Sequence, residues 1–129
     1  MPTTSLGSTP CHKVSQPRGV RIGGVPPPIL TPRGGLTLWH GVEPKEVVGI
    51  YRTYWSLLDR DDPSIILHAD DAPLLEASPE LTAPLADRMY IHDVVFTTGI
   101  ADAGNHYVVA SGEADLACRI THIPKAVFA

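Results

Sequence analysis

The stretch that decides the fold is residues 21–42, RIGGVPPPILTPRGGLTLWHGV. Its three consecutive prolines, at 26–28, fix φ near about −65° and carry no amide hydrogen, so they predict an extended crossing rather than a ladder strand. The glycine pair at 34–35 can adopt the positive φ values of a tight hairpin turn. A rigid lead-in of this kind predicts the architecture of a site rather than a linker.

The glycine pair predicts a hairpin between residues 29–31 and 36–42. Side chains alternate along a strand, so two sets are expected on opposite faces. These sets are Leu36, Leu38 and His40 on one face, and Thr37, Trp39 and Gly41 on the other. The strand therefore fixes the position of the His40 imidazole near its end, in the sequence Trp-His-Gly.

The composition predicts one all-β domain. The chain has 129 residues, 43% of them hydrophobic, with 11 glycines and 13 prolines among short Val, Ile, Thr and Tyr runs. A net charge of −4 gives no attraction to nucleic acid or to an anionic membrane, and neither is predicted as a partner. No targeting or anchoring segment is recognised, so a cytoplasmic location is expected. Cys11 and Cys118 can form a disulfide, but reduced thiols are the favoured interpretation.

Residues 1–19 have no apolar period and predict a disordered, flexible arm. Pro79 and Pro84 interrupt residues 73–88, which predicts an irregular connection with at most one helical turn. Turns are expected at 61–63, 102–105 and 113–114, and Gly99 is expected to end the strand before it. Further strands are predicted at residues 47–58, 65–68, 93–98, 106–112 and 115–122.

Five motifs occur in one order, and the match runs from about residue 21 to about residue 119: RIGGVPPPILTPRGGLTLWHGV, YRTYWSLLDRDDPS, APLLEASPEL, HDVVFTTG and HYVVASGEADLACRI. Together they resemble the C-terminal part of glycoside hydrolase family 130, the β-mannoside phosphorylases and related mannosidases. The resemblance implies a five-bladed β-propeller, of which residues 20–129 would supply about two to three blades. It also implies cleavage of β-mannosides with inversion, by phosphate to give mannose 1-phosphate or by water.

The resemblance also implies that the catalytic acid is an aspartate in an N-terminal half that this chain lacks. No catalytic residue is assigned here, and the chain alone is expected to be nearly inactive. His40 matches a family histidine expected to bind phosphate, and Arg21 stands near the place of a family lysine with the same task. Asp115, Trp39 and Glu113 are expected to contact sugar. The alternatives remain open: a strand-end histidine, a surface arginine, a turn aspartate and a packed tryptophan. Glu113 departs from the family pattern, and near phosphate it would favour hydrolysis.

No metal site is predicted, because four further histidines show no close metal-ligand spacing; they are His68, His92, His106 and His122. No cofactor is expected apart from inorganic phosphate as a co-substrate. A second group, Tyr51, Arg52, Asp59 and Asp62, is expected to build the sheets through Arg–Asp pairing. The competing hypothesis is a non-catalytic carbohydrate-binding or assembly module that pairs its open sheet edges with another chain. For the enzyme segment, the expected partners are the missing propeller half or a second copy.

Overall fold

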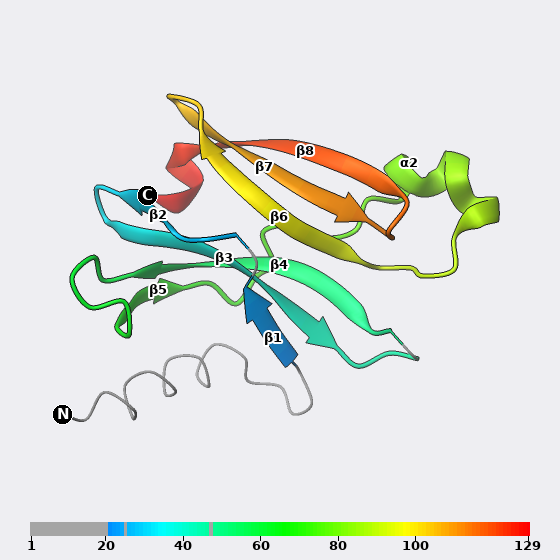
Figure 1. Cartoon of the computed structure of the whole chain (residues 1–129), viewed down its shortest axis with the longest axis horizontal. Coiled ribbons are helices and arrows are strands. Elements are labelled where there is room, and N and C mark those ends of the chain that lie inside the picture. Colours follow the sequence, from blue (N-terminus) through cyan, green and yellow to red (C-terminus); the bar gives the residue numbers. More distant parts are fainter. Residues whose placement is uncertain (1–20, 25, 47) are drawn as a thin grey trace.

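The computed structural model describes residues 21–24, 26–46 and 48–129, and within them it confirms an all-β protein. The predicted arm at 1–19 and Cys11 lie outside these residues. In this described part of the chain, eight strands form two antiparallel sheets (Figure 1). Among the described residues, no helix has both the length and the apolar character needed to cross a bilayer.

The first sheet has the order β1-β3-β4-β5, and β2 also pairs with β3. Its long central strands β3 and β4 stay in register over nine residue pairs, from Gly35↔Leu58 to Glu43↔Ile50. The strands are β1 (Arg21–Gly24), β2 (Ile29–Thr31), β3 (Gly34–Glu43), β4 (Ile50–Leu58) and β5 (Ile66–Ala69).

The second sheet has the order β6-β7-β8. Its strands are β6 (Val95–Asp102), β7 (His106–Glu113) and β8 (Ala117–Pro124), followed by the short 3-10 helix η2 (Lys125–Phe128). The two sheets form layers that face each other in Figure 1. β8 forms the outer edge of its sheet.

The core lies between the two sheets and is built by strand alternation. Every second side chain of β3, β4 and β7 enters it, and η2 closes one end with Phe128. A buried hydrogen bond of 2.7 Å between the hydroxyls of Thr53 and Thr97 also joins the sheets. The main cluster consists of Leu36, Leu38, Trp55, Leu57, Leu75, Val95, Tyr107, Val109, Ile123 and Phe128.

The predicted hairpin is present, but its turn differs from the expectation. Gly34 and Gly35 are the first residues of β3, and the loop consists of Pro32 and Arg33 between the paired ends Thr31 and Gly34. Only Gly34 of the pair has a positive φ, at 143°, and a Cβ there would collide with the Leu58 carbonyl oxygen. Glycine is therefore required at this position by both backbone and space.

Three other boundary predictions were wrong. β4 begins at Ile50 rather than at residue 47, because Gly49 turns the chain with a φ of 96°. β6 does not end at Gly99 but continues to Asp102 through a bulge. The expected join at residues 113–114 is shifted, since Glu113 closes β7 and the turn precedes Ala117.

The connection at 73–88 holds more helix than predicted. It contains a short helix α2 (Pro79–Thr82), followed directly by the 3-10 helix η1 (Ala83–Arg88). Both prolines occupy the N1 or N2 position of these helices. A proline there loses no hydrogen bond and already has a helical φ, so it begins a helix rather than interrupting one.

Candidate functional site

The β3–β4 loop, which lines a pocket together with Arg21, and the β7–β8 turn, which carries Asp115, lie at the same end of the two sheets, at the right in Figure 1; this is called the candidate end. Backbone hydrogen bonds join the parts of this end. The Tyr51 amide donates to the Asp93 carbonyl at 2.9 Å, and the Ala114 amide donates to the Val94 carbonyl at 2.9 Å. The start of β4, residues 93–94 and the β7–β8 turn therefore lie side by side.

His40 lies on the core-facing side of β3, two residues beyond the buried Leu38. Its ring centroid is 4.9 Å from that of Phe96 and 5.6 Å from that of Tyr51. On the other side the ring covers Gly23, its cross-strand partner, where a Cβ would lie 2.8 Å from ring atoms Cε1 and Nε2. Burial lowers the pKa of the imidazole, because desolvation disfavours its charged form.

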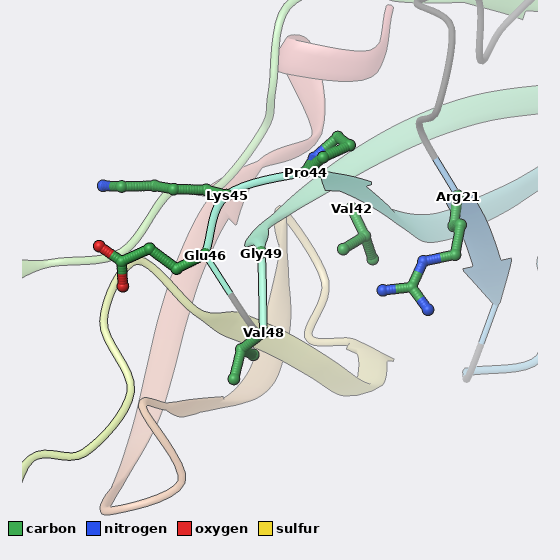
Figure 2. Close-up of a pocket in the computed structure, with 7 residues that line it drawn as sticks. All are labelled: Arg21, Val42, Pro44, Lys45, Glu46, Val48 and Gly49. Carbon is green, nitrogen blue, oxygen red and sulfur yellow. The ribbon is translucent and has the colours of Figure 1, made fainter.

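Arg21 shares this face, because it pairs with Val42 while Gly23 pairs with His40. It lines a pocket of about 160 Å³ between β1 and the β3–β4 loop. Figure 2 shows the Arg21 guanidinium directed toward Val42, while Lys45 and Glu46 extend away from it. No carboxylate among the described residues forms an ion pair with Arg21. Its charge is therefore available to an anion.

Asp115 lies in the β7–β8 turn and is exposed. Ala114 and Asp115 both have positive φ, 51° and 56°, and the Leu116 amide donates to the Glu113 carbonyl at 2.9 Å. This is the pattern of a type I′ turn, in which aspartate tolerates the left-handed conformation well. The buried Ala114 side chain packs against Ile91 and Val94 and fixes the turn in place. The Asp115 carboxylate is thus presented to solvent at the candidate end.

Glu113 has a different environment from Asp115. Its side chain is 1% exposed and accepts hydrogen bonds from Arg119 Nη1 at 2.6 Å and from the Ser78 amide at 3.1 Å. Arg119 Nη1 also donates to the Glu76 carbonyl at 2.7 Å. Both carboxylate oxygens are therefore used in holding the segment before α2 against β7 and β8.

Trp39 lies on the opposite face of the first sheet from His40, as the alternation predicts. Its ring stacks on Tyr54, with centroids 4.7 Å apart and planes at 19°. Its indole Nε1 donates to Ser56 Oγ at 3.0 Å. Trp39 and His40 are thus neighbours in sequence but belong to separate surfaces.

Sequence reasoning overlooked a charged network beside this site. Arg52 Nη1 donates to Glu43 at 2.7 Å and Arg52 Nε donates to Glu76 at 3.0 Å, so its partners are glutamates rather than the expected aspartate. These hydrogen bonds raise the pKa of Arg52, with the Glu43 bond as the largest cause. A second pocket of about 180 Å³ is lined by Arg52, Glu76, Tyr51 and Asp93. Glu76 lies in an irregular segment, so no periodicity pointed to it.

The two other predicted sheet-building residues act locally. Asp59 Oδ1 accepts hydrogen bonds from the Asp61 and Asp62 amides, at 2.9 and 3.0 Å. Asp62 Oδ1 accepts from the Ser64 amide and hydroxyl. They form the predicted turn after β4 rather than an ion pair. Within residues 21–24, 26–46 and 48–129, no three metal-ligating side chains come together.

The arrangement suits anion binding. Arg21 supplies a permanent positive charge, and a neutral His40 supplies one ring N–H donor. The exposed Asp115 carboxylate accepts hydrogen bonds from hydroxyl groups.

Comparison with known proteins places the chain in a family. Residues 4–128 match glycoside hydrolase family 130, described as beta-1,4-mannooligosaccharide phosphorylase. A beta-1,2-mannobiose phosphorylase of Thermoanaerobacter sp. (strain X514) is 36% identical over 107 residues, which are 83% of this chain and 32% of that protein. A 1,2-beta-oligomannan phosphorylase of the same strain is 38% identical over 96 residues, or 74% of this chain and 29% of that protein.

Solved structures agree with this result. The beta-1,2-mannobiose phosphorylase of Listeria innocua, in complex with beta-1,2-mannobiose, aligns with a TM-score of 0.69 and 29% identity over 83% of this chain and 28% of its own. A glycosyl hydrolase of Bacteroides ovatus aligns with a TM-score of 0.63 at 20% identity, over 78% of this chain and 29% of its own, and shows the fold alone. The chain thus spans about a third or less of the length of these relatives. It belongs to glycoside hydrolase family 130.

Proposed function

We propose that this chain is a segment of a β-mannoside-active enzyme and that it supplies the phosphate-contacting side of the active site. The observation that carries the proposal is the common face of His40 and Arg21 on paired strands. Gly23, the cross-strand partner of His40, lies two residues from Arg21, about 7 Å along β1 at the rise of a strand. An anion between them meets a fixed charge from Arg21 and a hydrogen-bond donor from His40.

The two sheets are proposed to be neighbouring blades of a five-bladed propeller, within a total of about two to three blades formed by residues 20–129. Support comes from their face-to-face packing and from the 25% to 32% of the curated relatives that the chain covers. The remaining blades, with the aspartate that acts as general acid, would come from elsewhere. Among the described strands β8 pairs only with β7, and its open edge is the proposed place for the missing part or a second copy to pair.

The other candidate residues receive separate roles. Asp115 is proposed to accept hydrogen bonds from sugar hydroxyl groups, because its carboxylate is exposed at the same end. Glu113 is buried against Arg119, so we propose that it acts on sugar only indirectly, by fixing the turn that carries Asp115. Among the described residues that line the Arg21 pocket, Glu46 carries the only carboxylate, and its side chain points away from Arg21 (Figure 2).

Phosphorolysis is favoured over hydrolysis, because the relatives at 36% to 38% identity are named phosphorylases and because Arg21 is available to an anion. The proposed substrates are a β-linked mannoside and inorganic phosphate, with mannose 1-phosphate as a product. The names of the relatives support a β-1,2 linkage, and the family description supports a β-1,4 linkage. Substrates with each of the two linkages are therefore included in the activity test below.

The face around Trp39 supports a second candidate function, a non-catalytic carbohydrate-binding module. Stacked aromatic rings offer an apolar plane to a sugar ring. Trp39 and Tyr54 form such a stack away from His40. Binding there would need neither phosphate nor the absent general acid.

The phosphate role is tested by titrating the chain with inorganic phosphate and following the His40 ring by NMR. We expect a saturable shift and a rise in the pKa of His40, because a bound anion favours the imidazolium. Arg21→Met should weaken this response, and His68→Gln should leave it intact. A response that survives Arg21→Met unchanged would contradict the proposed site.

The reaction is tested in a chimaera in which residues 21–129 replace the corresponding segment of the Listeria innocua relative. Release of mannose 1-phosphate from β-1,2- and β-1,4-mannobiose is measured with and without His40→Ala. The isolated chain should be nearly inactive, and the chimaera should lose turnover when His40 is removed. Equal turnover by both chimaeras would refute the role of His40. Mannan binding that depends on Trp39, without turnover, would favour the module.

A further inference from the structure

Two histidines that are distant in sequence come together on the outer face of the second sheet. Val108 of β7 pairs with His122 of β8, and His106 pairs with Pro124, so the histidines are diagonal neighbours. Their neighbours Tyr107 and Ile123 are buried in the core, which places both imidazoles on the opposite, outward face. The ring centroids are 5.1 Å apart.

This separation matches two imidazoles that share a metal ion. With the metal about 2.1 Å from one nitrogen of each ring, and about 1.1 Å from that nitrogen to the ring centre, a tetrahedral angle puts the centroids about 5 Å apart. The planes are inclined at 41°, so the rings are not stacked flat on each other. The spacing is therefore suited to coordination as well as to contact.

A neighbouring amide contacts one of the rings. His106 Nδ1 lies 2.7 Å from Asn105 Oδ1, and in the tautomer in which Nδ1 carries the proton it donates a hydrogen bond to this oxygen. The lone pair of Nε2 is then free for a metal. Metal-ligating histidines usually donate the second ring N–H to such an oxygen, which fixes the tautomer and raises the basicity of the ligand.

The surroundings leave the pair accessible. His122 is exposed and His106 is half-buried. The backbone amide of Lys125 donates a hydrogen bond to the Asn105 carbonyl at 3.3 Å. The Lys125 ammonium forms an ion pair with Asp102 at 2.9 Å and lies over the Tyr107 ring. The lysine charge is thus directed to partners other than the imidazoles.

We propose that His106 and His122 form a binding site for a divalent transition metal, with Asn105 as a positioning residue. The class of ligand is an ion that prefers imidazole nitrogen, such as Cu²⁺, Ni²⁺ or Zn²⁺, rather than Mg²⁺ or Ca²⁺. The chain supplies two ligands, so water or an external donor completes the coordination. A metal here cross-links β7 to the edge strand β8, and it does so independently of the proposed phosphate site.

The test uses the 129-residue chain and the metals alone. Calorimetric titration should show one site per chain, with affinity in the order Cu²⁺ above Ni²⁺ and Zn²⁺. Bound Cu²⁺ should give an electron paramagnetic resonance spectrum with two equivalent nitrogen couplings. Binding should also raise the midpoint of thermal unfolding, because the ion binds only the folded arrangement.

Three variants decide the assignment. His106→Gln and His122→Gln should each abolish the site and reduce the nitrogen coupling to one or none, while Asn105→Ala should weaken binding by about 10-fold or more. His92→Gln, at an exposed histidine elsewhere, is the matched control and should bind as the parent chain does. Unchanged binding in His122→Gln, or loss in His92→Gln, would overturn the proposal. So would the absence of any saturable binding of Cu²⁺ by the parent chain.

Discussion

Replacing Gly23 by alanine should move the His40 ring while leaving the fold intact. The new Cβ would lie 2.8 Å from both Cε1 and Nε2 of His40, about 0.6 Å short of ordinary van der Waals contact at 3.4 Å. The atoms that the new Cβ would meet belong to the end of a side chain rather than to the backbone, so the imidazole can move away. The Phe96 ring, 4.9 Å away centre to centre, blocks movement toward the second sheet, so we expect the imidazole to move outward.

The free energy of unfolding should change little. An alanine in a strand interior gains about 0.5–1 kcal/mol over glycine through backbone entropy. Displacing the imidazole from its preferred rotamer costs about 0.5–1.5 kcal/mol. The two effects oppose each other, so urea unfolding should agree with the parent chain within about 1 kcal/mol. A displacement of the His40 ring by about 0.6 Å is nevertheless large for a group that binds a substrate, because the rate of an enzyme depends steeply on the position of such groups.

NMR of the His40 ring is the assay. In Gly23→Ala the ring should lose part of its shielding by Phe96 and Tyr51, and its pKa should rise toward the ordinary value because the ring becomes more hydrated. Gly41→Ala is the matched control. Its Cβ would meet Tyr54 Cε1 at 2.9 Å on the opposite face, so it should disturb the aromatic stack and leave His40 unchanged. Identical His40 resonances in Gly23→Ala and the parent would refute the close contact.

Three further changes test the energetics of the structure. Thr53→Val should destabilise the chain by about 1–3 kcal/mol, because it leaves the Thr97 hydroxyl buried without its partner, and adding Thr97→Val should recover part of the loss in urea unfolding. His40 has a lowered pKa in the folded state, so the unfolded chain takes up the proton first as pH falls. The free energy of unfolding should therefore fall as pH drops below about 6.5 toward the lowered pKa, and His40→Gln should reduce this slope; an equal slope would contradict the burial effect. Glu113→Gln should cost about 3–5 kcal/mol by leaving Arg119 without its carboxylate, whereas the double change to Glu113→Met and Arg119→Leu should cost less. A cost below about 1 kcal/mol for Glu113→Gln would show that this pair behaves as an exposed one.

The β3 strand could be predicted in detail because its information is local. Alternation alone assigns Leu38 to the core face and Trp39 to the other, and the structure confirms both. The turn before it was misplaced because glycine permits a positive φ at either of two positions. Pairing with β4, which brings the Leu58 carbonyl against Gly34, selects one of them. Such a contact depends on tertiary structure and leaves no mark on the local pattern.

The short helices and the bulge were missed for a related reason. A proline interrupts a helix in its interior and begins one at its first turn, so Pro79 was ambiguous until the boundary was known. Gly99 was expected to end β6, but the strand continues past it because β7 provides a partner along its whole length. The meeting of His106 with His122 was likewise hidden, because it depends on the register between β7 and β8.

The consecutive residues Trp39 and His40 make the two functional hypotheses separable. They lie on opposite faces of one strand, so a change in either side chain leaves the other face in place. An enzyme segment requires His40 for its response to phosphate and is indifferent to Trp39→Leu, whereas a carbohydrate-binding module has the reverse requirement. Because the two substitutions fall on the same strand, differences in strand stability largely cancel between them. If both responses disappear together in either variant, the assumption that the two faces act independently is wrong.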